Sequence, residues 1–282
     1  MLKVSDWAAS QPVRPTRLAA SRCLKFCEHK GVVFPGQDSQ LLHSFPPGPP
    51  VPALKPGCVQ VWYARWTERL ADLNELAAVL APEEQARAQR FRFERDRNRY
   101  IAGRAILRQL LSRYTGVPPA EIQLGYGHRG KPFLPACPEL EFNMSDAGEL
   151  LAYAFRLQMP VGIDIEVSRP QLDSTALAQR YFHPLEVRAL LEEAPESRHA
   201  AFLRCWTRKE AFVKAIGEGL RFGLDRFAVP IREGEGCVLV DPSGGEPRNW
   251  KIFELRPGPN YFGAVVTREP VAGIVEWTVP RW

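Results

Sequence analysis

Val161-Gly162-Ile163-Asp164-Ile165-Glu166 is the stretch of sequence that decides the fold, because it sets two acidic residues into an apolar, β-branched run. Prolines at positions 160 and 170 bound this run, and β-branched residues favour strands. Successive side chains of a strand point to opposite faces, so both carboxylates leave one face while the apolar side chains enter a core on the other. Paired carboxylates suit a hard cation such as Mg²⁺, which takes one or two protein carboxylates and completes its shell with water and substrate phosphate.

A second informative stretch, Trp206-Thr207-Arg208-Lys209-Glu210-Ala211-Phe212-Val213-Lys214, begins about forty residues after the first. Its pattern predicts a helix anchored by apolar side chains, on which Glu210 and Lys214 lie four residues apart on one face. A third carboxylate and a cation can therefore join the two carboxylates of the strand.

Each stretch taken singly also allows a simpler interpretation. The two strand carboxylates can form the solvated face of an edge strand. Glu210 and Lys214 can form an ordinary surface ion pair, which contributes only a few tenths of a kcal/mol.

The two stretches together resemble the two-part signature of the Sfp-type 4′-phosphopantetheinyl transferases. In that family Gly-(Ile/Val)-Asp-x-Glu is followed by (Phe/Trp)-(Ser/Cys/Thr)-x-Lys-Glu-(Ala/Ser)-x-x-Lys, and every position matches here. Further segments are similar to the family in the same order: a basic helical region at 82–108, Gly-Lys-Pro at 130–132 and Phe-Asn-x-Ser at 142–145. The resemblance covers roughly residues 57 to 270.

The fold that the pattern predicts is α+β, and the resemblance implies two similar α+β subdomains packed as a pseudo-dimer with the active site in the cleft between them. We expect a proline-rich, mobile extension over residues 1–56, an N-terminal subdomain over 57–159 and a C-terminal subdomain with the metal site over 160–282. Seven prolines between 35 and 56 support the first of these boundaries. The predicted helices span 67–80, 83–115, 174–181, 184–192 and 197–217. The predicted strands span 59–64, 121–126, 140–144, 150–156, 161–166, 225–230, 236–240, 248–255 and 261–267.

The resemblance also implies the chemistry, which is transfer of the 4′-phosphopantetheine arm of coenzyme A to a serine of an apo acyl, peptidyl or aryl carrier protein. Adenosine 3′,5′-bisphosphate would leave, and Mg²⁺, or Mn²⁺ in its place, would stabilise the developing charge. The matching positions assign metal binding to Asp164, Glu166 and Glu210. Glu210 also matches the family's candidate base, acting directly or through a metal-bound water, and Lys214 matches a catalytic cation near the pyrophosphate of coenzyme A.

The contacts to coenzyme A that follow from the matching positions are Arg87, Arg99, Lys131 and Ser145, together with Lys214, and Arg104 is a weaker candidate whose alternative is a solvated helix face. The sequence departs from the family at Asp146, where the usual residue is a histidine near the 3′-phosphate. A carboxylate there would repel the phosphate unless it turns away or pairs with a neighbouring arginine. Asp146 is therefore a doubtful member of the coenzyme A site, and the metal carboxylates are unaffected.

Composition narrows the partners only slightly. The 282 residues carry a formal net charge of +5, a modest bias toward anionic partners such as nucleotide phosphates or an acidic protein surface. Six cysteines show neither paired zinc spacing nor a disulfide framework, and Cys23, Cys27 and His29 lack a fourth ligand for a metal site. We therefore expect reduced thiols and a cytoplasmic protein. We also expect a monomer. Arg90-Phe91-Arg92-Phe93 lacks a nucleic-acid-binding pattern and is interpreted as a helix with its phenylalanines inward. No apolar run is long enough for a membrane span.

Three classes of function remain open from the sequence. The first is the transferase of fatty acid, polyketide or nonribosomal peptide synthesis, with the natural carrier unspecified. The second is a degenerate relative that binds coenzyme A or a carrier without catalysis, which would have no need of all four of Asp164, Glu166, Glu210 and Lys214. The third is an interaction protein, which would leave the pairing of the two stretches unexplained.

Overall fold

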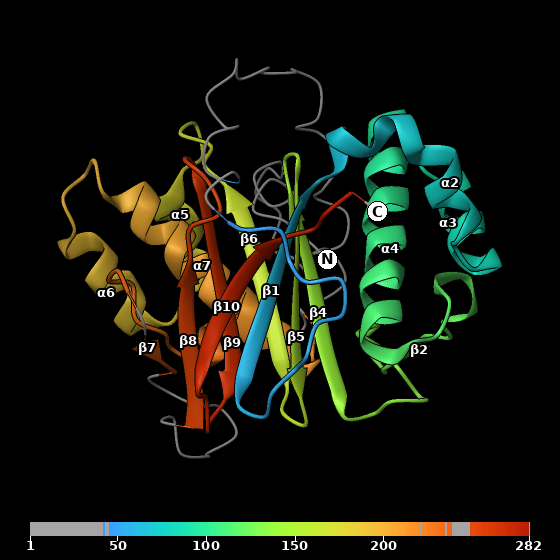
Figure 1. The fold of residues 1–282 in the computed structure, drawn as a ribbon. Helices are drawn as coiled ribbons and strands as arrows, with labels where there is room; N and C mark the ends of the chain where they lie inside the picture. The colour runs from blue at the N-terminus through green and yellow to red at the C-terminus, as the bar shows by residue number, and fades with distance from the viewer. Residues whose placement is uncertain (1–41, 43–44, 220–221, 235, 239–248, 282) are drawn as a thin grey trace.

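Two four-stranded sheets form the centre of the molecule (Figure 1). The computed structural model describes residues 42, 45–219, 222–234, 236–238 and 249–281. The first sheet has the order β10-β1-β5-β4 and the second has the order β6-β9-β8-β7. Their strands are β1 (Cys58–Arg65), β4 (Leu140–Ala147), β5 (Leu150–Leu157), β10 (Gly273–Thr278), β6 (Val161–Val167), β7 (Gly236–Cys237), β8 (Trp250–Leu255) and β9 (Tyr261–Arg268). A small hairpin pairs β2 (Gly125–Tyr126) with β3 (Pro132–Phe133).

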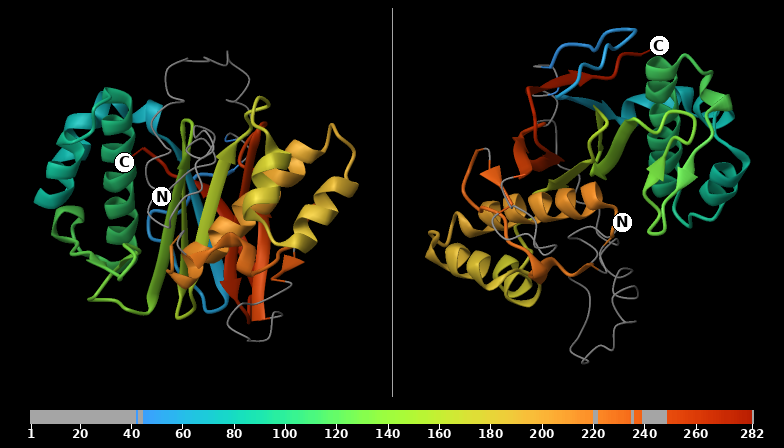
Figure 2. Two further views of the ribbon diagram at one scale, coloured as in Figure 1. Left: turned by 180° about the vertical axis from the view of Figure 1, so that it is seen from behind. Right: turned by 90° about the horizontal axis from the view of Figure 1, so that it is seen from below.

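Each sheet carries its own group of helices on its outer face, and the two groups lie on opposite sides of the strands (Figures 1 and 2). The first group consists of α2 (Leu73–Ala78), α3 (Pro82–Gln89) and α4 (Glu94–Thr115), with 3₁₀ turns η3 (Trp66–Asp72) and η4 (Pro119–Glu121). The second consists of α5 (Ser174–Tyr181), α6 (Pro184–Glu192) and α7 (Arg198–Ile216), followed by the 3₁₀ turn η6 (Leu224–Arg226). The α+β class and the arrangement of two related halves are confirmed.

Three apolar clusters stabilise these layers. One joins α4 to the outer face of the first sheet through residues such as Trp62 and Phe155, and one joins α7 to the second sheet through Trp206 and Phe212. The third lies between the inner faces of the two sheets and contains the apolar residues of β6, including Ile163. The predicted alternation of β6 is therefore confirmed, since its apolar side chains enter a core shared by both halves.

The last strand, β10, was not predicted and crosses between the halves. It follows the second sheet in the sequence, yet it pairs in parallel with β1 at the edge of the first sheet. The first sheet thus contains a strand from within residues 160–282, while the boundary between 159 and 160 stays a prediction.

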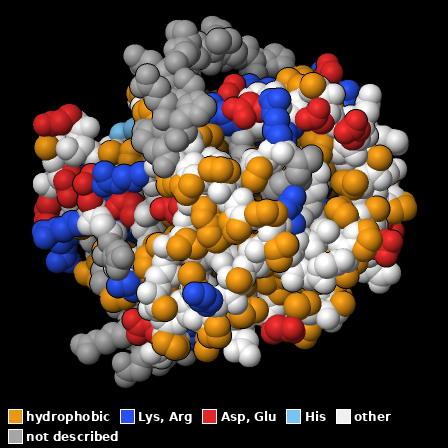
Figure 3. All heavy atoms as spheres, viewed as in Figure 1, with side chains coloured by type: hydrophobic (Ala, Val, Ile, Leu, Met, Phe, Trp, Pro, Cys, Tyr) orange, Lys and Arg blue, Asp and Glu red, His pale blue; other side chains and the backbone are white. Residues whose placement is uncertain are grey.

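Residues 45–56 correct the expectation of a mobile extension, because they pack against the first sheet (blue trace, Figure 1). Pro47 bridges to Thr278 of β10, whose backbone exchanges hydrogen bonds with Pro46 and Gly48. The Gln60 side chain donates to the carbonyl of Ala53 at 3.0 Å. Apolar side chains gather over the middle of this face of the molecule (Figure 3). Residues 1–41 lie outside the described residues, and so do Cys23, Cys27 and His29.

The predicted helix over 83–115 was wrong in its continuity, because residues 90–93 separate α3 from α4. Glu84 of α3 accepts hydrogen bonds from Arg104 and Arg108 of α4, both at 2.6 Å. A continuous helix would hold Glu84 and Arg104 about 30 Å apart, so the chain must turn back for them to meet. The same break overturns the interpretation of residues 90–93 as helical, and Phe93 is exposed.

Other predicted elements also differ in detail. The region 67–80 forms η3 and α2, and the predicted strand at 121–126 is reduced to Gly125–Tyr126. The predicted strand at 225–230 was wrong, because η6 occupies its start and the rest forms only a single β-bridge at Ala228. Its neighbours bond to side chains instead: Lys209 donates to Phe227 O, Arg208 donates to Pro230 O, and Glu186 accepts from Val229 N. The predicted strand at 236–240 is described only as β7, since residues 239 and 240 lie outside the described residues.

Within the described residues, no helix is both long and apolar enough to cross a membrane.

Candidate active site

The two decisive stretches of sequence meet where α7 lies directly on β6. The meeting depends on Gly162, because a Cβ atom at this position would lie 2.0 Å from the carbonyl oxygen of Ala211 and 2.4 Å from the backbone nitrogen of Ala215. Only a glycine allows the helix backbone to come this close to the strand. The close approach brings the functional side chains of α7 against the carboxylates of β6.

Asp164 is held in this interface by two donors. Its side chain is almost fully buried, and Oδ1 accepts hydrogen bonds from Lys214 Nζ at 2.6 Å and from Ser145 Oγ at 2.9 Å. The other oxygen, Oδ2, is buried without a hydrogen-bond partner among the described residues. One oxygen is therefore fixed by the protein and the other is left for a ligand.

Glu210 and Glu166 complete, with Asp164, a group of buried carboxyl groups. Both side chains are almost fully buried, and Glu210 Oε1 also lacks a hydrogen-bond partner within the described part of the chain. Burial, followed by the charge of Asp164 and then that of Glu166, raises the pKa of Glu210 to about 8, although Lys214 acts in the opposite direction. The solvated edge strand and the surface ion pair are both contradicted, since these carboxylates and Lys214 are buried.

The donor set fits a hard divalent cation. Two orphaned carboxylate oxygens, Asp164 Oδ2 and Glu210 Oε1, are oxygen donors of the kind that Mg²⁺ or Mn²⁺ takes, and a cation would offset their mutual repulsion. Across the described residues, no three His, Cys, Asp or Glu side chains are already arranged as a complete cage. Mg²⁺ needs only one or two protein carboxylates, because water and substrate phosphate fill its remaining positions.

The first half of the chain reaches this site through β4. The backbone N–H of Ile163 donates to Asn143 Oδ1 at 3.0 Å, and that of Ile165 donates to Ser145 Oγ at 3.3 Å. Side chains of β4 therefore satisfy the free edge of β6 where a neighbouring strand would otherwise pair. The Phe-Asn-x-Ser segment thus belongs to the site, although it sits in the other half of the sequence.

Lys131 lies at the same junction. Its Nζ atom donates to Glu141 at 3.2 Å, to the carbonyl of Val161 at 3.3 Å and to the carbonyl of Ala215 at 3.2 Å. It therefore ties β4, β6 and the end of α7 together, and its predicted contact with coenzyme A stays a prediction.

Sequence reasoning missed the role of Lys209, the lysine inside the second signature. Its Nζ atom lies 2.6 Å from Glu186 Oε1 with both side chains fully buried, and it also donates to the carbonyl of Phe227. Glu186 in turn accepts from the backbone of Val229 and of His183. The pair fixes α6 and the segment after η6 against α7. The fixed position of this lysine in the signature was the only sign in the sequence that it has a role. Its partner Glu186 lies 23 residues earlier in the sequence, so no local pattern connects the two.

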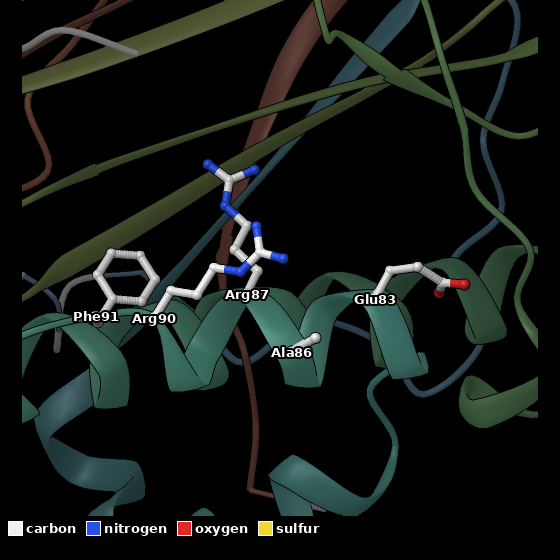
Figure 4. A pocket seen from close by; sticks show the side chains of 5 residues that line it. All are labelled: Glu83, Ala86, Arg87, Arg90 and Phe91. Carbon is white, nitrogen blue, oxygen red and sulfur yellow. The ribbon is translucent and has the colours of Figure 1, made fainter.

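The predicted coenzyme A arginines lie on α3 and α4, apart from the carboxylates in the sequence. A cavity of about 690 Å³ beside α3 is lined by Glu83, Ala86, Arg87, Arg90 and Phe91. The Arg87 and Arg90 side chains project from the same side of α3 (Figure 4), and Arg87 also lies over the Tyr100 ring.

Arg99 and Arg104 are engaged differently. Arg99 Nε lies 3.3 Å from Asp146 Oδ2, so Asp146 pairs with an arginine, one of the two arrangements that relieve its repulsion of a phosphate. Arg104 is buried against Glu84, so the alternative of a solvated helix face is wrong, and a contact of Arg104 with coenzyme A stays a prediction. Burial would raise the pKa of Glu84, but Arg104 and Arg108 together hold it below its usual value.

Comparison with known proteins supplies the family. The model of the 4′-phosphopantetheinyl transferase superfamily matches residues 160–267, and that of the 4′-phosphopantetheinyl transferase N-terminal region matches residues 64–157. The 4′-phosphopantetheinyl transferase HetI of Nostoc sp. is 36% identical over 245 residues, which cover 86% of this chain and 99% of that protein. The 4′-phosphopantetheinyl transferase Sfp of Bacillus subtilis is 32% identical over 194 residues, covering 68% of this chain and 84% of that protein.

A mammalian relative and one solved structure were also found. The L-aminoadipate-semialdehyde dehydrogenase-phosphopantetheinyl transferase of Mus musculus is 29% identical over 227 residues, covering 73% of this chain and 72% of that protein. The crystal structure of Thermotoga maritima holo-[acyl-carrier-protein] synthase aligns with a TM-score of 0.31 and 21% identity, over 39% of this chain and 62% of that one. The sequence relatives and the family models together span both halves of the fold. The chain therefore belongs to the 4′-phosphopantetheinyl transferase family and is an enzyme of that family.

Proposed function

We propose that this enzyme takes the 4′-phosphopantetheine arm from coenzyme A, requires Mg²⁺, and attaches the arm to a serine of an apo carrier protein. The observation that carries the proposal is the pair of buried, unpartnered oxygens on Asp164 and Glu210, which come from the two halves of the family signature. A buried carboxylate oxygen without a partner is costly unless a ligand satisfies it. The donor set selects a hard cation, with Glu166 as the third carboxylate.

The reaction is a displacement at the phosphorus that carries the pantetheine arm. The serine oxygen forms a bond to this phosphorus while the bond to the bridging oxygen breaks, and adenosine 3′,5′-bisphosphate leaves with the electron pair. The proton of the serine goes to the carboxylate of Glu210. The pKa of about 8 belongs to the cation-free site, and a bound cation would lower it and keep the group ionised and able to accept the proton. When bound, Mg²⁺ would supply Lewis-acid stabilisation to the phosphoryl oxygens.

The basic side chains of α3 and α4 provide the counter-charge for the nucleotide. Arg87 and Arg90 line an open cavity, and their side chains project in the same direction. Arginine donors suit phosphate groups because their planar fork matches two oxygens at once. We assign Arg87 to coenzyme A on this basis. The assignment of Arg99, which already pairs with Asp96 and Asp146, rests on its matching position in the family alone.

Intact-mass spectrometry tests the proposal. Wild-type enzyme incubated with coenzyme A, Mg²⁺ and an apo carrier protein should add the mass of one arm, and a carrier with its serine replaced by alanine should stay unmodified. Asp164→Asn keeps the shape of the side chain but removes its charge, and it should slow transfer by about 100-fold or more.

The matched control is Glu68→Ala, which removes a carboxylate whose side chain is 58% exposed and lies outside the site, and it should leave the rate unchanged. Transfer by Asp164→Asn at the wild-type rate under limiting Mg²⁺ would remove Asp164 from the metal site. Absence of any added mass with the wild-type enzyme on acyl, peptidyl and aryl carriers would overturn the proposed reaction.

A further inference from the structure

His199 joins the end of β6 to the first turn of α7. Its Nε2 atom lies 3.1 Å from Ser168 Oγ and 3.3 Å from the backbone nitrogen of Arg169, and its Nδ1 atom lies 2.7 Å from Ser174 Oγ. Ser168 and Arg169 follow β6 directly, and Ser174 is the first residue of α5. One half-buried side chain therefore holds both ends of the connection between β6 and α5 against α7.

The directions of these hydrogen bonds require a neutral imidazole. A backbone N–H can only donate, so Nε2 accepts from Arg169, and the ring proton sits on Nδ1 and is donated to Ser174 Oγ. The Ser168 hydroxyl is then a second donor to Nε2. A proton on Nε2 would face the N–H of Arg169, and the backbone cannot turn to accept it, although the Ser168 hydroxyl can. Burial lowers the pKa of His199, which favours the same neutral ring.

Among the described residues, the hydrogen bonds to the ring come from hydroxyl and backbone groups and from no charged side chain. The charged or titratable residues on the elements around the ring are Arg169 and Asp173 of the connection, Glu196 and Arg198 at the start of α7, and Tyr261 of β9. Asp173 accepts from the backbone of Ala176 at 3.0 Å, and Arg198 donates to the carbonyls of Glu193 and Leu191. The surroundings of the ring therefore stabilise its neutral form.

His199 lies at one end of the seam between β6 and α7. At the other end, Gly162 brings the backbone of Ala211 against β6. The strand rises by about 20 Å from Gly162 to Ser168, and the helix rises by about 18 Å from His199 to Ala211, so the two elements run antiparallel between two fastenings of matching separation. The stretch between the fastenings carries all three candidate metal carboxylates, Asp164, Glu166 and Glu210.

We propose that His199 is a positioning residue whose neutral ring holds the Glu166 end of β6 against α7, and that protonation of the ring releases this end. Glu166 acts on Glu210 electrostatically across the seam, so a loosened end would change the distance between the two carboxylates. The inference rests on the proposed function, because this distance matters to the reaction only if both groups bind the cation. It adds a cause for loss of activity in acid that is separate from protonation of the carboxylates.

His199→Gln tests the protonation step, because the amide oxygen of glutamine can accept near the position of Nε2 and stays neutral at every pH. The measurement is kcat against pH at saturating coenzyme A, Mg²⁺ and carrier protein. Since an ordinary histidine titrates near about pH 6.5, the variant should match the wild type at about pH 8 and exceed it by at least about twofold at about pH 5. A ratio of the two kcat values that stays constant across this range would overturn the inference.

His199→Ala removes the fastening at every pH. At about pH 8 its kcat should fall by about 10- to 100-fold and Mn²⁺, measured by electron paramagnetic resonance on the enzyme alone, should bind at least about tenfold more weakly, while the KM for coenzyme A changes by less than about twofold. Wild-type kcat and Mn²⁺ affinity in the folded variant would refute the positioning role. His128→Gln is the matched control, because it replaces a histidine that is 65% exposed and lies beside Glu218, beyond the far end of α7. Its kcat should follow the wild-type pH profile.

Hydrogen exchange of the enzyme alone separates this inference from the proposed function, because it needs no substrate. After correction for the intrinsic rate, the Arg169 amide should lose at least about threefold in protection from about pH 8 to about pH 5 in the wild type, and no protection in His199→Gln. Unchanged protection in a wild-type enzyme that transfers the arm would overturn the positioning role alone. The expected loss of protection in an enzyme that transfers no arm at any pH would overturn the proposed function, and the positioning role with it.

Discussion

Gly162→Ala should damage the enzyme by pushing α7 away from β6. The added Cβ atom would lie 2.0 Å from Ala211 O and 2.4 Å from Ala215 N, and both are backbone atoms that no side-chain rotation can move. To bring the first contact to 3.0 Å, the helix must withdraw by at least 1.0 Å, the difference between the two distances. Overpacking of this kind costs about 1–3 kcal/mol, and for a chain of this size each kcal/mol lowers Tm by about 2–4 °C.

The same displacement should reduce activity more than stability. Lys214 and Asp164 touch at 2.6 Å, so a withdrawal of 1.0 Å breaks their hydrogen bond and moves Glu210 with it. A misplacement of about 1 Å typically costs about 100-fold in rate. We therefore expect Gly162→Ala to lose about 2–12 °C in Tm and about 100-fold in kcat, measured by calorimetry and by the mass-spectrometric transfer assay.

Gly103→Ala is the matched control. Gly103 lies inside α4, and its Cβ would lie 3.4 Å from the Met144 side chain, an ordinary contact. Alanine is favoured over glycine inside a helix by about 0.5–1 kcal/mol, so this variant should be as stable as the wild type or slightly more stable. If Gly162→Ala keeps the wild-type Tm and kcat, the close approach of α7 to β6 is not what places the site.

Three further predictions follow from other parts of the structure. Lys209→Met should lower the free energy of unfolding, measured in urea, by about 3–5 kcal/mol, because it leaves the buried carboxylate of Glu186 without its cation. A loss below about 1 kcal/mol would show that this ion pair does not stabilise the fold. A chain that begins at residue 57 should melt several degrees below one that begins at residue 45, because residues 45–56 pack on β10 and cover Trp62; equal Tm values would show that this packing adds no stability. Without divalent cations, the free energy of unfolding should fall as pH rises from about 4.5 to about 8, because the folded state keeps the proton of Glu210 in this range and the unfolded state has lost it. Glu210→Gln should flatten this pH dependence. An unchanged slope in the variant would show that other groups cause the pH dependence.

Local sequence signals were enough to predict the elements that carry the site. The bounds predicted for α5 and α6 agree with the structure, because Asp173 caps the first and Pro184 opens the second. The strand of Asp164 was predicted from its β-branched residues and flanking prolines, and the helix of Glu210 from the spacing of its apolar and charged residues.

The parts that could not be predicted depend on contacts between residues far apart in the chain. Glu84 of α3 bonds to arginines of α4 across the break between the two helices, and β10 joins the first sheet by pairing with β1, more than 200 residues earlier. Periodicity reports only on neighbours within a few turns, so it carries no information about such pairs.

The candidate site shows the same division. The resemblance assigned three carboxylates to the metal, and Ser145, Lys131 and Lys214 to coenzyme A, and these roles stay predictions. What it could not reveal is that the donors of the latter three also bond within the protein. Hydrogen-bond saturation is a property of the folded site, and residue type alone cannot reveal it.

The most direct measurement is the anomalous scattering of Mn²⁺ in crystals of the full-length enzyme grown with Mn²⁺ and coenzyme A. We predict an anomalous peak within direct coordination distance of Asp164 Oδ2 and Glu210 Oε1. A peak elsewhere, or no peak beside these carboxylates, would contradict the proposed cation site.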